Sequence, residues 1–211
     1  MSQRTKPPFR ADHVGSLLRP RRLTDARAKA KAGEITGDAL RAFEDDAIRE
    51  AVALQESVGL HAITDGEFRR DYWHIDFLSS FDGVETVWPE LVNRFTTDEQ
   101  PPTNKVSGKV GRSKGIFTDH FAYLASVTTE TPKITIPGPA MIYMRPGRAG
   151  IDATVYPDLE PFWEDLCAAY RAEIDGLYAL GCRYLQIDDV SFAYLCDDKM
   201  RQTYADRGDD P

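Results

Sequence analysis

Two long stretches of helical periodicity each end at a glycine and are followed at once by a short apolar segment. The first covers residues 37–58 and ends at Gly59, and the second covers residues 158–180 and ends at Gly181. Glycine is a common residue just past the end of a helix. Parallel sheets use very short connections between a helix and the next strand, like those at Gly59 and Gly181. The pattern therefore predicts parallel β–α units.

Short apolar runs that end in glycine, proline or a carboxylate are typical of the strands in such a fold. Four are predicted along the chain, at residues 11–18, 60–64, 133–139 and 183–187. No GxGxxG pattern follows the first of them, which disfavours a dinucleotide-binding sheet. A complete (β/α)8 barrel takes roughly 250 residues. We therefore expect an α/β chain forming about the first half of a TIM-type (β/α)8 barrel, with residues 1–211 as a single incomplete domain.

Residues 82–117 interrupt this alternation and do not have helical periodicity. Two stretches of alternating character, 84–88 and 91–95, precede a double proline and a segment rich in lysine and glycine at 105–115. A connection of this length is uncommon unless it has a role of its own. We expect a β-hairpin insertion here. Its lysines lack the P-loop pattern, and a solvated hairpin is the ordinary interpretation.

The overall charge and the cysteine pattern exclude several classes of protein. The chain has 26 basic and 34 acidic residues, giving a net charge of −8, which disfavours nucleic acid or an anionic membrane as a partner. No apolar run approaches the roughly 20 residues of a membrane span, and the N-terminus lacks the apolar core of a signal peptide. We expect a cytoplasmic protein. The three cysteines form no CxxC pair, and no metal site is predicted.

Polar side chains follow the predicted strands, where α/β barrels bind their ligands. Two carboxylates at separate strand ends, Glu67 and Asp188, suit the ammonium group of an amino acid, because charge-assisted hydrogen bonds are strong. Backbone N–H groups after Gly15 suit its carboxylate. His13, Asp65 and Asp189 lie beside these positions and are candidate pocket residues.

Four motifs, in this order, resemble the catalytic barrel of cobalamin-independent methionine synthase, most closely the short homologues often called methionine synthase II. They are His13–Leu17, Thr64–Arg70, Ile134–Pro139 and Leu185–Asp189. The resemblance spans residues 9–200 and implies a (β/α)8 barrel. It also implies transfer of a methyl group, from 5-methyltetrahydrofolate or a related donor, to the thiol of homocysteine, which zinc activates.

The resemblance also implies roles for particular residues. Val14, Gly15 and Ser16 match the loop that binds the amino acid carboxylate, and Glu67 and Asp188 match the carboxylates that bind its amino group. The family's zinc ligands would lie beyond residue 211, so we expect neither metal ligands nor catalytic residues within this chain. The chain departs from the family pattern at one motif, where Asp189 and Val190 replace the usual Glu and Pro.

Simpler interpretations of the same residues remain open. Glu67 can pair with a neighbouring arginine at the surface, Asp188 and Asp189 can cap a helix, Asp65 can be a turn residue, and His13 can be structural. The chemistry can also differ, as in barrels that transfer other thiols, including coenzyme M, or that resemble uroporphyrinogen decarboxylase. A truncated, inactive half-barrel is a further alternative, and its exposed strand edges would favour a homo-oligomer.

Overall fold

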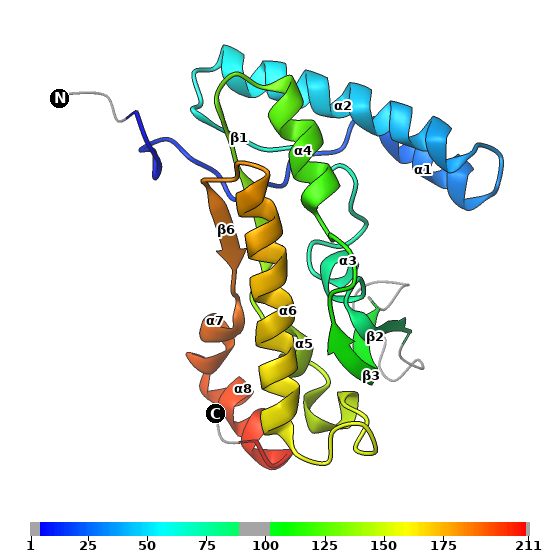
Figure 1. Ribbon diagram of the computed structural model, residues 1–211, viewed down its shortest axis with the longest axis vertical. Helices are drawn as coiled ribbons and strands as arrows, with labels where there is room; N and C mark the ends of the chain where they lie inside the picture. The colour runs from blue at the N-terminus through cyan, green and yellow to red at the C-terminus, as the bar shows by residue number, and fades with distance from the viewer. Residues whose placement is uncertain (1–4, 89–101, 210–211) are drawn as a thin grey trace. The chain divides into compact units, whose positions relative to one another are not determined.

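The computed structural model describes residues 5–88 and 102–209 (Figure 1). The described residues form two compact units. Unit 1 takes its described residues from Met1–Asp71, Phe117–Thr135 and Leu177–Gln186, and unit 2 takes them from Tyr72–Ile116, Ile136–Gly176 and Ile187–Pro211. The structure is a mixture of helices and strands, which confirms the α/β class. No helix among the described residues is long and apolar enough to cross a membrane.

Two helices in the first part of the chain supply most of the core of unit 1. Helix α1 is Arg21–Lys31 and helix α2 is Gly37–Ser57. The hydroxyl of Thr36 accepts a hydrogen bond from the Ala39 N–H and so caps α2. The apolar stripes of the two helices pack together with a later helix, α4 (Thr118–Val127), which contacts α2 (Figure 1). The core residues are Leu23, Ala47, Ile48, Ala51, Val52, Ile63, Phe68 and Leu124.

The strands of unit 1 are short and parallel. Strand β1 (Ala62–Ile63) pairs with β4 (Thr131–Pro132) in parallel register. The predicted strand at 11–18 is reduced to a single parallel bridge between Ser16 and Gly66. The reason is that the carbonyls of Val14 and Gly15 bond to side-chain hydroxyls rather than to a neighbouring strand.

Strands β5 (Ile134–Pro137) and β6 (Leu185–Asp188) form a two-stranded sheet. The Ile134 N–H donates to the Tyr184 carbonyl and the Gly138 N–H to the Asp188 carbonyl, so both strands advance in the same direction. The boundary between the two units falls within both strands. The parallel pairing is the kind that the sequence predicts for β–α units.

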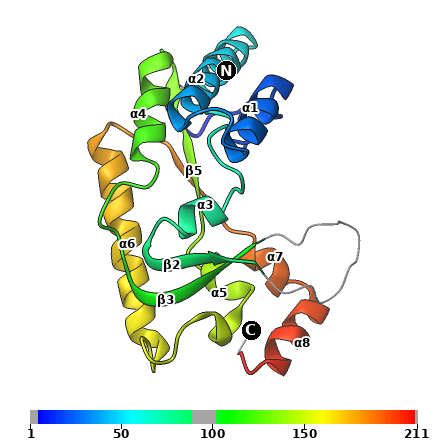
Figure 2. The same ribbon diagram turned by 90° about the vertical axis from the view of Figure 1, so that its right-hand side faces the viewer.

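Unit 2 contains the predicted hairpin. Strand β2 (Asp82–Val87) pairs in antiparallel register with β3 (Thr103–Gly111), as Figure 2 shows. The predicted stretch 91–95 lies outside the described residues. The remaining elements of unit 2 are α3 (Ile75–Leu78), α5 (Met141–Met144), η1 (Gly147–Gly150), most of α6 (Leu159–Ala179), α7 (Ser191–Leu195) and α8 (Asp198–Asp206).

Candidate functional site

The loop that carries Val14, Gly15 and Ser16 is fixed by two threonine hydroxyls. Thr135 Oγ1, on β5, donates to the Val14 carbonyl at 2.7 Å. Thr64 Oγ1, which follows β1, donates to the Gly15 carbonyl at 2.7 Å. These two bonds hold the loop against Thr64, which directly follows β1, and against Thr135, the second residue of β5.

Gly15 is in close contact with the side chains around it. A Cβ atom built at this position would lie 2.7 Å from Thr135 Oγ1 and 3.3 Å from Glu67 Oε1. The first distance is shorter than any ordinary contact of a Cβ atom, so a larger residue would push one of its neighbours away. The absence of a side chain at Gly15 therefore allows the Glu67 carboxylate to lie directly against the loop.

Glu67 has an unusual backbone conformation. Its φ is +58°, a left-handed conformation that side-chain-bearing residues seldom adopt. Its N–H donates to Asp65 Oδ1 at 2.8 Å, and its carbonyl accepts from Arg19 Nη2 at 3.1 Å. The residue is only 3% exposed. Residues held in rare conformations and supported from several sides are characteristic of functional sites.

The Glu67 carboxylate has a buried cationic neighbour. Arg70 Nη1 lies 3.6 Å from Glu67 Oε1, and Arg70 Nη2 donates to the Thr135 carbonyl at 2.7 Å. The Arg70 guanidinium carbon is 4.2 Å from the centre of the Phe117 ring, a cation–π contact. Since Arg70 is 1% exposed, its charge acts on Glu67 with little screening by water. The interpretation of Glu67 as part of a surface ion pair is wrong, because both partners are buried.

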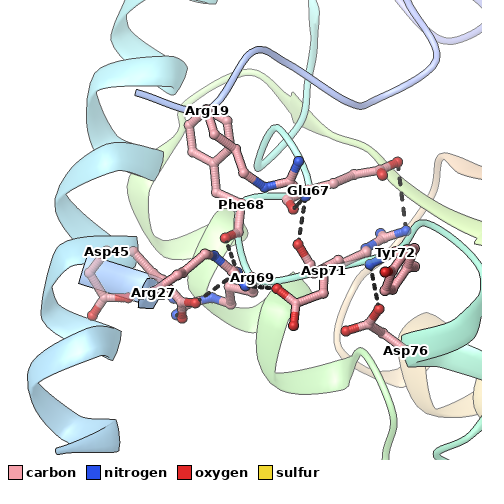
Figure 3. A network of polar contacts seen from close by, with 11 residues as sticks. Arg19, Arg27, Asp45, Glu67, Phe68, Arg69, Asp71, Tyr72 and Asp76 are labelled. Carbon is pink, nitrogen blue, oxygen red and sulfur yellow. Dashed lines mark hydrogen bonds and ion pairs between the residues drawn. The ribbon is translucent and has the colours of Figure 1, made fainter. Parts of the chain in front are cut away.

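A second layer of polar contacts supports the turn that contains Glu67 (Figure 3). Arg19 Nη2 also donates to the Arg70 carbonyl at 2.6 Å. Arg27 hydrogen bonds to the Phe68 carbonyl and to Glu44, at 3.0 Å for the latter. Burial raises the pKa of Glu44, and the positive charges of Arg27 and Arg69 oppose that effect. The turn is thus held by side chains from α1, α2 and the loop that precedes α1.

Asp65 has one oxygen bonded to the Glu67 N–H, and its other oxygen, Oδ2, is buried without a hydrogen-bond partner among the described residues. The same is true of Nδ1 of His120, on α4. Burial lowers the pKa of His120 to about 4; the charge of Asp65 opposes this effect, and Arg70 reinforces it. At pH 7 the His120 imidazole is therefore neutral and adds no positive charge beside Asp65.

His13 contacts a different network in unit 1. Its Nε2 is 2.9 Å from Gln55 Oε1, and the Gln55 amide donates to the carbonyls of Ala51 and Thr64. This geometry supports the structural interpretation of His13. Its role as a pocket residue stays a prediction.

Asp188 and Asp189 belong to unit 2. The Asp188 carbonyl accepts from the Gly138 N–H at 2.6 Å. Asp189 Oδ1 accepts from the Ser191 N–H at 2.8 Å, at the start of α7, and a Cβ atom on Gly138 would lie 2.8 Å from Asp189 Oδ2. The geometry of Asp189 fits the helix-capping interpretation. The joint binding of one ammonium by Glu67 and Asp188 stays a prediction, because the two residues belong to different units.

Several residues that build the site were not singled out from the sequence. Thr64 and Thr135 appear in the quoted motifs without a role, and Arg19 appears in none of them. Their bonds reach residues 48 to 121 positions away in the chain. No local pattern signals such partners. Within the described part of the chain, no three or more His, Cys, Asp or Glu residues are grouped so that they can hold a metal ion.

Known proteins that are similar to this chain belong to the family that the four motifs resemble. Residues 9–206 match the family described as cobalamin-independent synthase, catalytic domain. YxjH of Bacillus subtilis (strain 168), described as uncharacterized, is 41% identical over 208 residues, which cover 98% of this chain and 54% of YxjH. A methionine synthase of Sulfurisphaera tokodaii is 30% identical over 177 residues, which cover 83% of this chain and 50% of that protein.

A solved structure has a similar fold. The crystal structure of a putative vitamin-B12 independent methionine synthase from Listeria monocytogenes superimposes with a TM-score of 0.78 at 39% identity, covering 96% of this chain and 60% of that one. The chain spans about half the length of the curated relatives it matches. The family predicted from the motifs is confirmed: this chain belongs to the cobalamin-independent synthase catalytic-domain family.

Proposed function

We propose that this chain is the first part of a (β/α)8 catalytic barrel that binds homocysteine and takes part in methyl transfer to its thiol, giving methionine. The observation that carries the proposal is the Glu67 carboxylate, buried, set in a left-handed turn and lying against Gly15. The family membership and the parallel strands β1, β4, β5 and β6 support it.

In this proposal, unit 1 binds the amino acid end of the substrate. Glu67 accepts hydrogen bonds from the substrate ammonium, and backbone N–H groups of Val14, Gly15 and Ser16 donate to its carboxylate. The bond between the Glu67 carboxylate and the substrate ammonium would be charge-assisted, which makes it stronger than a hydrogen bond between neutral groups. Asp188 is proposed, from the family resemblance, as a further substrate-binding residue.

The proposed reaction forms a sulfur–carbon bond as the bond from the donor nitrogen to its methyl group breaks; the thiol loses its proton, and the nitrogen of the demethylated donor gains one. 5-Methyltetrahydrofolate or a related donor supplies the methyl group. A free thiol is mostly protonated at neutral pH because its pKa is about 8.5. The zinc ion that would activate the thiol in this family does not fit the described residues, so no step is assigned to it within this chain.

The test is methionine formation from homocysteine and 5-methyltetrahydrofolate by the natural gene product that carries this sequence, purified as the cell makes it. Glu67→Gln and Asp188→Asn should each lower kcat/KM for homocysteine by about 10- to 100-fold, since each removes a charge-assisted bond. Glu34→Gln, an exposed carboxylate in the loop after α1, is the matched control.

Two results would overturn the proposal. One is an absence of methyl transfer to homocysteine by the unmodified protein. The other is full activity in both site variants. Activity with a thiol that lacks the amino acid group, such as coenzyme M, at a kcat/KM above that for homocysteine would favour the alternative thiol-transfer chemistry.

A further inference from the structure

The turn from Thr64 to Glu67 places a carboxylate two residues before the residue proposed to bind the substrate. Asp65 is 3% exposed, and its Oδ1 accepts the hydrogen bond from the Glu67 N–H at 2.8 Å. The Thr64 hydroxyl, in the same turn, bonds to the Gly15 carbonyl. Asp65 therefore acts on the backbone of Glu67 from within the turn.

Glu67 needs support of this kind because of its conformation. For a residue with a side chain, a φ of +58° is less stable than the common conformations, since Cβ crowds the carbonyl that follows. The conformation persists only where surrounding contacts fix it. Asp65 fixes the N–H side of Glu67 and Arg19 fixes its carbonyl side. If Glu67 relaxed to a common conformation, its side chain would leave the contact with Gly15.

Only Oδ1 of Asp65 bonds to Glu67, while Oδ2 is buried without a hydrogen-bond partner among the described residues. A direct role of the carboxylate charge therefore has to be separated from the role of the Oδ1 bond. Asparagine would preserve the Oδ1 acceptor and nearly the same volume, whereas alanine would remove the acceptor. The two substitutions thus separate a role through the Glu67 N–H from a role that needs the negative charge.

We infer that Asp65 is a positioning residue, which acts through its hydrogen bond to the Glu67 N–H to hold the Glu67 carboxylate against Gly15, where the substrate ammonium binds. The inference rests on the proposed function for the identity of the substrate. The geometry of the turn does not depend on that identity.

Steady-state kinetics of the natural gene product with homocysteine tests the inference. Asp65→Ala should raise KM for homocysteine at least 10-fold and change kcat less, whereas Asp65→Asn should stay within about threefold of the unmodified protein, since it keeps the acceptor. In a Glu67→Gln background, Asp65→Ala should have little further effect on KM, because Asp65 acts through Glu67. Equal losses in Asp65→Asn and Asp65→Ala, or losses that add to that of Glu67→Gln, would overturn the inference.

Amide hydrogen exchange, measured without substrate, keeps this test separate from that of the function. Exchange at the Glu67 N–H should be faster in Asp65→Ala than in the unmodified protein or in Asp65→Asn, while exchange in the middle of α2 stays unchanged. Unchanged exchange at Glu67 in Asp65→Ala contradicts the positioning role even where the protein proves inactive toward homocysteine. An inactive protein with faster exchange contradicts only the proposed function.

Discussion

Arg70 and Glu67 form a buried ion pair in which Arg70 Nη1 lies 3.6 Å from Glu67 Oε1. The pair belongs to a turn of only four residues, so the cation and the carboxylate it neutralises are placed by the same piece of backbone. Arg70 also binds the Thr135 carbonyl of β5. The Arg70 guanidinium therefore contacts both the Glu67 carboxylate and strand β5, whose Thr135 side chain lies against Gly15.

Removing Arg70 should destabilise the fold strongly. Arg70→Ala removes the buried positive charge beside the Glu67 carboxylate and the donor to the Thr135 carbonyl, which should lower the free energy of unfolding by about 3–5 kcal/mol. Arg21→Ala, which removes an exposed pair with Asp25 at 3.9 Å, should cost less than about 1 kcal/mol. Urea denaturation monitored by circular dichroism measures both. Equally small losses of unfolding free energy in the two variants would show that the buried pair stabilises the fold no more than the exposed pair does.

A side chain at Gly15 should displace Glu67. Gly15→Ala brings Cβ within 2.7 Å of Thr135 Oγ1 and 3.3 Å of Glu67 Oε1, so it should cost about 1–3 kcal/mol of stability and weaken homocysteine binding. Gly59→Ala is the matched control, because Gly59 also has a positive φ, +82°, but a Cβ there would meet nothing within 4 Å. It should lose about 1 kcal/mol of stability and keep its affinity. Equal affinities for homocysteine in Gly15→Ala and Gly59→Ala would contradict the displacement of Glu67 by a side chain at position 15.

The Thr135 hydroxyl should be needed to fix the Val14–Ser16 loop. Thr135→Val keeps the size of the side chain and removes the bond to the Val14 carbonyl, so we expect homocysteine to bind several-fold more weakly. Thr135→Ser keeps the hydroxyl and should bind as the unmodified protein does. Calorimetric titration compares them, and a serine variant as impaired as the valine variant would show that the methyl group, not the hydrogen bond, matters.

Two histidines should make the protein less stable in mild acid. Burial lowers the pKa of both His74 and His120 from an ordinary 6.5 to about 4, with help from the charge of Arg145 at His74. Because the unfolded chain binds these protons more readily, the stability that the neutral histidines contribute is fully present above pH 6.5. It is lost as the pH falls from 6.5 towards 4, by on the order of 2–3 kcal/mol for each histidine.

The double variant His74→Asn, His120→Asn isolates this effect from the carboxylates that titrate in the same range. Its free energy of unfolding, measured in urea at pH 7 and pH 4.5, should fall less between the two values than that of the unmodified protein. An equal fall in both proteins would assign the acid sensitivity to other groups.

The helices and most strands could be predicted from the sequence because their signals are local. The predicted helix at 37–58 is observed as α2, Gly37–Ser57, and the predicted helix at 158–180 as α6, Leu159–Ala179. In both cases the apolar spacing lies within the helix, and the glycine that marks its end follows two residues after it. The first strand was overestimated, because its carbonyls bond hydroxyls from distant threonines.

The site was only partly predictable, because several of its contacts join residues that lie far apart in the sequence. Glu67 stands out in the sequence as a carboxylate after an apolar run, but nothing local predicts its left-handed conformation. That conformation depends on Arg19, 48 positions earlier, and on Asp65, which was interpreted as either a pocket or a turn residue. The substrate-binding roles assigned to Val14, Gly15, Ser16, Glu67 and Asp188 remain predictions.

Calorimetric titration of homocysteine into the natural gene product and its Glu67→Gln variant, with Glu34→Gln as the control, tests most directly whether Glu67 binds the substrate. We predict that Glu67→Gln raises Kd at least 10-fold, because the amide loses the charge-assisted bond to the ammonium, while Glu34→Gln leaves Kd unchanged. Binding of homocysteine by Glu67→Gln as tight as by the unmodified protein would contradict a role of Glu67 in substrate binding.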